Sequence, residues 1–478
     1  MTRGVGFRGR HGTTLPRSYR DSALSTRHVT KMTRPRPRMT TRVRFRRRTP
    51  QIQLARLGIF VPESPAPQPP DPIFQEPMPS QSASAPAGRI VGVDVARGLA
   101  LLGMMATHIM PLTRADESGA VHATWAATIF AGTSSALFAI LAGVGLALLT
   151  GGSRPHTGTR LKSGRRSILV RAVLITVIGL GCGALNTNVA VILVHYGALF
   201  LIATLFLGLR LRTLWFSAVG WLLLSPVLWY LLLPLATSRI SPATVGPSPG
   251  LGDLLRPASL TADLFITGYY PVLVWTGFIV LGLAVGRCRL SLPPVALALT
   301  VGGALLSWAA RALSDHLIGA NDQALRTLGA ITEANGLPLD AALLSGHGLE
   351  GVEGTPWWFA LSAPHSSTPL DLLHVAGTAL AVLGLCQLLA MALSALLGLA
   401  GDALLWPLSG AGSATLTLYA GHLVALDLLS TVTAGMPRLG LYLCFVVGSL
   451  LVGIGLKWAG RRGPLEAGIH VLARSGTA

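Results

Sequence analysis

The stretch VGVDVARGLALLGMMATHIM, residues 91–110, is apolar enough and long enough to cross a lipid bilayer, yet it contains Asp94, Arg97 and His108. Ionisable side chains inside a membrane span are costly and by default indicate function. The whole chain is 51% hydrophobic and 12% charged, with a mean hydropathy of +0.57. Because soluble globular proteins contain about 25% charged residues, this composition predicts an integral membrane protein.

Long apolar segments rarely show two-residue alternation here, which favours transmembrane helices over a β-barrel. We therefore expect an all-α polytopic membrane protein with about ten spans. The expected spans are 91–112, 129–150, 168–185, 189–208, 214–235, 268–286, 292–313, 372–397, 404–429 and 439–459. The ninth contains Pro407 and the sequence SGAGS, which suggests a broken or re-entrant segment.

Arginine and lysine concentrate in every second loop, for example SRPHTGTRLKSGRRS between the second and third spans and RCR between the sixth and seventh. Positively charged loops stay on the cytoplasmic side. The pattern predicts that both chain ends are cytoplasmic. Two long loops, about 236–267 and 314–371, then face outward.

The first 88 residues form a separate region in this interpretation. This tail is rich in arginine and proline and has no apolar core, so we expect it to be disordered. Such a tail could bind nucleic acid or anionic lipid. We favour a translation start at or near Met78 instead, and expect no nucleic-acid partner. Residues 89–478 are then the transmembrane domain.

Five histidines from separate segments are expected near the outer face of the membrane: His108, His122, His195, His374 and His422. A neutral imidazole can take a proton near neutral pH, so the group suggests acid–base chemistry. The alternative is that each histidine only bonds a neighbouring helix. The histidines lack the HxxxH spacing of a metal site, and the four cysteines form no CxxC pair, so we expect neither a bound metal nor a disulfide framework.

The inner half of the membrane is expected to hold Asp94, Arg97 and Arg171. Asp94 and Arg97 are three residues apart and share one helix face, so they could form an internal ion pair. Arg97 and Arg171 could instead bind phosphates from the cytoplasm, because the planar guanidinium donates two hydrogen bonds at once.

The first two spans resemble those of the heparan-α-glucosaminide N-acetyltransferase-like membrane proteins. GRIVGVDVARGLALLGMMATHIMPL fits the opening R-x-x-x-x-D-x-x-R-G of that family, and HATWAATIFAGTSSALFAILAGVGLAL fits its H-A-x-W motif. DLLHVAGTALAVLGLCQLL and GSATLTLYAGHLVAL resemble related bacterial membrane proteins of unknown function.

The resemblance implies a membrane acyltransferase that uses cytoplasmic acetyl-CoA, or another acyl-CoA, to modify a sugar or lipid-linked acceptor outside the cytoplasm. It also implies a multi-pass location in a bacterial plasma membrane, in contact with lipid, and it leaves a homodimer open. The family's active-site histidine falls on His122, as base or as nucleophile. His108 is second, and Asp371 or His374 could orient the imidazole.

The remaining expected roles divide between the two substrates. Asp94, Arg97 and Arg171 are candidates for binding CoA, and Trp125, His195, Tyr196 and His422 for binding the acceptor. Two other classes of function stay open: a proton-coupled transporter or permease for a small molecule, and a non-catalytic scaffold or sensor.

Overall fold

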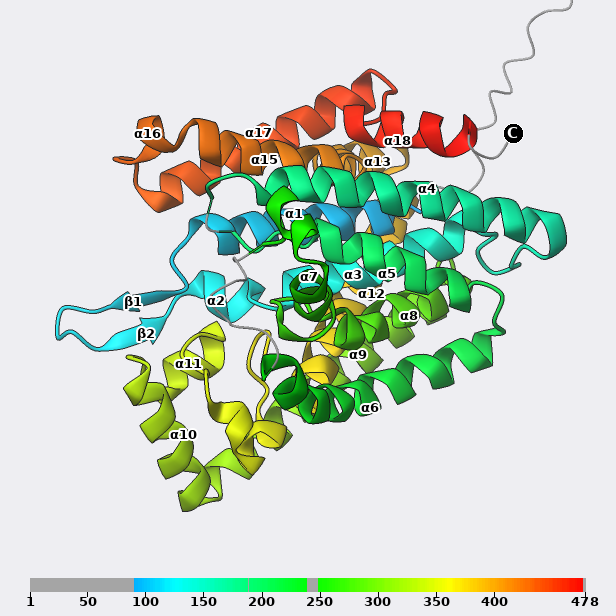
Figure 1. Ribbon diagram of the computed structural model, residues 1–478. Coiled ribbons are helices and arrows are strands. Elements are labelled where there is room, and N and C mark those ends of the chain that lie inside the picture. The colour runs from blue at the N-terminus through cyan, green and yellow to red at the C-terminus, as the bar shows by residue number, and fades with distance from the viewer. Residues whose placement is uncertain (1–89, 188, 239–247, 476–478) are drawn as a thin grey trace, which may run out of the picture. The chain divides into compact units, whose positions relative to one another are not determined.

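The computed structural model describes residues 90–187, 189–238 and 248–475. The basic tail, the proposed start at Met78 and Arg89 of the family motif lie outside these residues. Helices running roughly side by side make up most of the described part of the chain (Figure 1). A short β-hairpin and the helices α10 and α11 lie at one end of them, and helix α18 lies at the other.

The described helices follow the apolar segments of the sequence. Their bounds are α1 Val91–Ile109, α2 Trp125–Phe130, α3 Thr133–Leu149, α4 Gly158–Gly183, α5 Leu193–Phe206, α6 Leu211–Thr237, α7 Pro257–Ala262, α8 Val272–Arg287, α9 Pro293–Gly319, α10 Asp322–Ala334, α11 Leu339–Ser345, α12 Pro369–Leu397, α13 Leu399–Leu404, α14 Trp406–Ala411, α15 Thr415–Leu428, α16 Ser430–Thr433, α17 Arg438–Trp458 and α18 Pro464–Ser475. The short turns are η2 Leu251–Leu255, η3 Asp263–Thr267, η4 Val352–Gly354 and η5 Pro356–Ala360.

Six described helical stretches are long and apolar enough to cross a membrane: Trp125–Leu149, α4, α6, α9, α12 and α17. A seventh is added if Pro257–Thr267 and α8, which meet at a 56° bend, count as one broken span. Helices α5 and α15 are apolar but short. The structure thus supports an all-α polytopic membrane fold, while the number of ten spans and the cytoplasmic placement of both ends stay predictions.

The predicted break in the ninth segment is present. Residues 404–429 divide between α14 and α15 instead of forming one helix. Helix α14 packs against α1 and α17. A side chain at Gly412 would collide with the backbone of Asp94, and one at Gly98 with the carbonyl of Leu408, so glycine permits this close approach.

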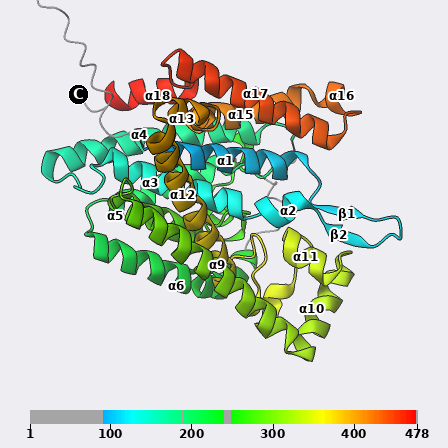
Figure 2. The same ribbon diagram turned by 180° about the vertical axis from the view of Figure 1, so that it is seen from behind.

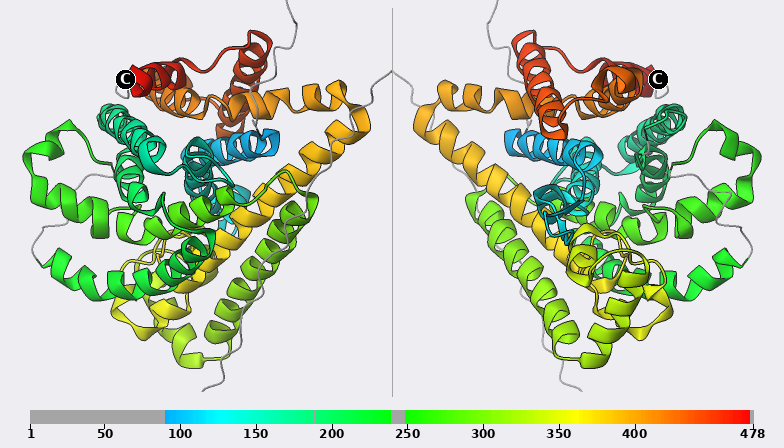
Figure 3. Two further views of the ribbon diagram at one scale, coloured as in Figure 1. Left: turned by 90° about the vertical axis from the view of Figure 1, so that its right-hand side faces the viewer. Right: turned by 90° about the vertical axis from the view of Figure 1, so that its left-hand side faces the viewer.

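Helix α1 lies in the interior of the helix assembly. It contacts α3, α12, α14 and α17, and most of its residues are buried. Helix α12 crosses the other helices obliquely (Figure 2) and packs along α9 (Figure 3). The location of α1 is important because His108 lies in its last turn.

Arg287 lies at the end of this assembly opposite the β-hairpin. Its guanidinium is buried and donates to the carbonyl oxygens of Ala147, Thr150, Gly152 and Leu207 and to Oγ1 of Thr150, at 2.9–3.0 Å. One side chain therefore ties the ends of α3 and α5 to α8. The sequence indicated only a cytoplasmic charge at this position.

The other end contains structure that the sequence did not indicate. Strands β1 (Thr113–Ala115) and β2 (Val121–Ala123) pair antiparallel, with Arg114 opposite His122. The expected loop 314–371 is largely helical: α9 continues to Gly319, and α10 and α11 follow. The hairpin adds six strand residues to an all-α fold, and the sequence did not indicate them because a three-residue strand is too short for its alternation to be visible.

Candidate functional site

A cavity of about 970 Å³ opens between the helices at the end that carries the hairpin. We call it the outer cavity. Its polar lining consists mainly of histidines, acids and tyrosines. These residues are His108, His195, His347, His365, Asp263, Glu350, Glu353, Tyr269 and Tyr270. No lysine or arginine lines it among the residues that the structure describes.

His108 is held in this lining by His422 of α15. Nδ1 of His108 lies 3.0 Å from Nε2 of His422, and the two rings are nearly parallel. Nδ1 of His422 lies 3.3 Å from the carbonyl oxygen of Leu418 and must therefore donate. With both rings neutral, Nε2 of His422 accepts from Nδ1 of His108. This assignment leaves the lone pair on Nε2 of His108 free to accept a proton.

A second, smaller pocket of about 300 Å³ lies toward the opposite end of the helices, and we call it the inner pocket. Arg97 from α1 and Arg171 from α4 both line it, as the sequence predicts for a phosphate-binding group. Nε of Arg171 is buried and has no hydrogen-bond partner among the described residues. The inner pocket thus offers two guanidinium groups to an anion.

Asp94 and Arg97 form the internal ion pair that their spacing predicts, and Arg97 also lines the inner pocket. Arg97 donates from Nη1 to Asp94 at 3.4 Å and from Nη2 to the carbonyl of Leu141 at 3.2 Å, and its side chain is 26% exposed. Asp94 is buried and does not line the inner pocket. Asp94 therefore orients Arg97, and only Arg97 faces the pocket.

The two compartments adjoin at a cluster of histidines and tyrosines. On α5, His195 lines the outer cavity and the next residue, Tyr196, lines the inner pocket. Tyr419 lines the inner pocket, and its ring meets the rings of His108 and His422 edge-on at centroid distances of 6.0 Å and 5.2 Å. Tyr419 thus connects the lining of the inner pocket to His108 in the lining of the outer cavity.

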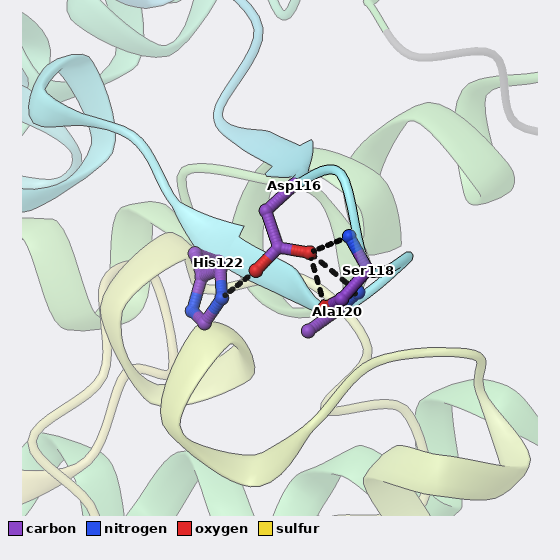
Figure 4. A network of polar contacts seen from close by, with 4 residues as sticks. All are labelled: Asp116, Ser118, Ala120 and His122. Carbon is purple, nitrogen blue, oxygen red and sulfur yellow. Dashed lines mark hydrogen bonds and ion pairs between the residues drawn. The ribbon is translucent and has the colours of Figure 1, made fainter.

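His122 lies apart from this cluster, on the exposed hairpin (Figure 4). Its Nε2 is 3.1 Å from Asp116, and its side chain is 58% exposed. Hydrogen bonds, first from the Ser118 side chain and then from His122, lower the pKa of Asp116 to about 2. The Asp116–His122 pair has the form of an imidazole oriented by a carboxylate, but His122 does not line the outer cavity.

Three further predicted site residues, His374, Asp371 and Trp125, also lie outside the outer cavity. His374 contacts the hydroxyl and the carbonyl of Ser307 on α9 at 3.0–3.1 Å. Asp371 is buried in the first turn of α12. Trp125 begins α2 and contacts the rings of Phe130 and Tyr442. Of the four expected catalytic residues, the structure brings only His108 to the outer cavity.

Several residues that the sequence analysis missed line the outer cavity. Asp263 is 5% exposed, and its side chain has no hydrogen-bond or ion-pair partner among the described residues. His365 lies in the loop before α12, where burial lowers its pKa to about 3, with the nearby His347 adding to the effect. Both residues lie outside the long apolar segments, and this is why hydropathy did not single them out.

Comparison with known protein families finds one match, and it covers the part of the chain that holds His108 and Arg97. Residues 89–301 match the family described as "Heparan-alpha-glucosaminide N-acetyltransferase, catalytic". This part of the chain is similar to the catalytic region of that family. The acetyltransferase match includes Arg97, His108, Arg171 and His195 and confirms the resemblance drawn from the first two spans. No curated protein and no solved structure matches the chain.

The matched region ends within α9, so the acetyltransferase family does not cover α12 or α15. His422, which holds His108, and His365 therefore come from outside the matched region. The chain is a multi-pass membrane protein in which residues 89–301 resemble the catalytic region of a membrane acetyltransferase family.

Proposed function

We propose that the protein transfers an acyl group, in the first place acetyl from cytoplasmic acetyl-CoA, to an amine or hydroxyl group of an extracytoplasmic sugar or lipid-linked acceptor. The single observation that carries this proposal is the free Nε2 of His108 at the junction of the inner pocket and the outer cavity. The family match supports the reaction class. We place the protein in a bacterial plasma membrane.

The inner pocket is the proposed entry for the acyl donor. Arg97 and Arg171 supply the positive charge that phosphate groups need. Tyr196 and Tyr419 line the same pocket beside the histidine cluster. This arrangement would direct the acyl end of the donor toward His108 while the phosphates stay near the guanidinium groups.

The outer cavity is the proposed site for the acceptor. A nearly buried carboxylate without a partner, such as Asp263, is costly unless a cation pairs with it. Glu350 and Glu353 add two more acids to the lining. This lining favours an acceptor with a positively charged amine over one with phosphate or sulfate groups.

An acceptor that binds as an ammonium group first loses one proton, which the carboxylate of Asp263 in the cavity lining takes, because only the neutral amine is nucleophilic. The attack itself then needs one further proton acceptor. The acceptor nitrogen or oxygen attacks the thioester carbonyl, the new C–N or C–O bond forms, and the C–S bond breaks. Nε2 of His108 takes the proton of the attacking group and returns it to the thiolate of CoA. His422 keeps His108 in the tautomer that can accept this proton.

His108 and His122 are competing candidates for this role. We place the proton transfer at His108, because it lines the cavity and adjoins the inner pocket. The H-A-x-W motif favours His122, whose partner Asp116 would orient it in the same way. Replacement of each histidine in turn separates the two assignments.

The test uses the full-length protein in liposomes with acetyl-CoA and glucosamine. Release of the CoA thiol and formation of N-acetylglucosamine are measured for the wild type, His108→Ala, His122→Ala and the exposed control His316→Ala. We expect only His108→Ala to reduce the rate, by about 100-fold or more. Loss of activity in His122→Ala with an active His108→Ala would move the site to the hairpin. Transport of glucosamine without thiol release would favour the transporter.

A further inference from the structure

The turn before α12 holds two residues in an unfavourable backbone conformation. His365 and Ser367, in the sequence APHSST, have φ of 60° and 59°, and they are the described non-glycine residues with positive φ. Thr368 fixes the turn, because its hydroxyl donates to the carbonyl of Leu361 at 2.6 Å and accepts from the amide of Asp371. Backbone strain of this kind gathers at functional sites.

The strained turn places the ring of His365 in an aromatic enclosure. The ring centroid of Tyr269 lies 4.3 Å away, and those of Tyr270 and Trp275 lie 5.6 Å and 6.3 Å away. Nδ1 of His365 is buried and has no hydrogen-bond partner among the described residues. His365 also lines the outer cavity, so its other ring nitrogen, Nε2, is the one available to a ligand.

A small chamber of about 10 Å³ is also lined by His365. His365, Ser367 and Asp371 are its polar lining residues. Asp371 is 4% exposed, and its Oδ1 has no hydrogen-bond partner in the described part of the chain. His365 and Asp371 thus line one chamber, and each has one buried polar atom without a hydrogen-bond partner among the described residues. A volume of about 10 Å³ is at the lower limit of what one water molecule needs.

We infer that Asp371 fixes the tautomer of His365 through one ordered water in this chamber. The carboxylate accepts from the water, the water accepts from Nδ1–H, and Nε2 keeps its lone pair toward the outer cavity. Asp371 is a positioning residue, and His365 binds the acceptor by receiving a hydrogen bond from its N–H or O–H group. The role toward the acceptor rests on the proposed function, whereas the tautomer does not.

The first test reads the tautomer directly and needs no activity. Full-length protein labelled with ¹⁵N-histidine is compared by solid-state NMR with His365→Gln, which identifies the His365 signals. We expect protonated Nδ1 in the wild type and in the control Asp340→Asn, whose acid lies exposed in the first turn of α11. Asp371→Asn should shift the population toward protonated Nε2. Protonated Nε2 in the wild type, or an unchanged Asp371→Asn spectrum, would overturn the inference.

The second test reads the role toward the acceptor. His365→Phe should raise the KM for glucosamine about tenfold and leave the KM for acetyl-CoA unchanged. Asp371→Asn should raise the same KM, and the double variant should be no worse than His365→Phe alone. His316→Phe is the matched control.

Failure of the inference about His365 can be distinguished from failure of the proposed acyl transfer. An unchanged KM for glucosamine in an active His365→Phe would contradict acceptor binding by His365. A wild-type protein that transfers no acyl group would contradict the proposed function, and the NMR comparison would still decide the inference.

Discussion

Nδ1 of His108 lies 3.0 Å from Nε2 of His422, although 314 residues separate them in the chain. The carbonyl of Leu418 requires a proton on Nδ1 of His422, and this proton determines which nitrogen of His108 stays free. The catalytic base that we propose in α1 is thus set by a residue of α15.

This relationship predicts the effect of replacing His422. His422→Phe removes the acceptor for Nδ1–H of His108, so His108 can adopt the other tautomer, in which Nε2 cannot take a proton. We expect kcat for thiol release to fall about tenfold or more, with the KM for acetyl-CoA unchanged. Steady-state kinetics of His422→Phe and the wild type check this, and a wild-type kcat in His422→Phe would show that the pair is only structural.

The inner pocket predicts a charge requirement for donor binding. Arg97→Gln and Arg171→Gln should each raise the KM for acetyl-CoA about tenfold or more, because a hydrogen bond to a charged group contributes about 1.5–3 kcal/mol. The exposed Arg212 at the start of α6 provides the control Arg212→Gln. If all three variants gave the same KM as the wild type, phosphate binding at the inner pocket would be contradicted.

Arg287 and Arg289 offer a matched pair for stability. Arg287 is 4% exposed and donates five hydrogen bonds, whereas Arg289, two residues later, is exposed. Arg287→Ala leaves several buried carbonyl groups unpaired, and we expect a loss of about 3 kcal/mol or more. Thermal unfolding in detergent should show a clearly lower Tm for Arg287→Ala and little change for Arg289→Ala. Equal Tm values would contradict the structural role.

The pH dependence of stability should contain a contribution from His365. Burial lowers its folded-state pKa to about 3, while an unfolded histidine titrates near ~6.5. The unfolded state therefore binds the proton first, so this contribution is fully present above pH ~6.5 and is lost progressively as the pH falls toward about 3. Thermal unfolding at several pH values should show a weaker acid destabilisation in His365→Gln than in the wild type. The same slope in both proteins would contradict a buried neutral His365.

The sequence predicted the helices well because long apolar segments are direct signals. It also predicted that five histidines share one depth; of these, His108 and His195 line the outer cavity and His422 contacts His108. Arg97 and Arg171, expected together on the other side, both line the inner pocket. Which histidines meet was not predictable, since the pairing of His108 with His422 depends on how α1 packs near α15. His365 and Asp263 were missed because neither lies in a long apolar segment. Asp371 was expected to orient His122, whereas the structure places it in one chamber with His365.

The acyl-transfer rate of His108→Ala in liposomes tests the central claim most directly, with acetyl-CoA supplied on the side of the inner pocket and glucosamine on the side of the outer cavity. We predict normal insertion and folding, a rate at least about 100-fold below the wild type, and wild-type rates in His316→Ala. A folded His108→Ala protein that transfers acetyl groups at the wild-type rate would contradict the assignment of His108 as the base at the junction of the two compartments.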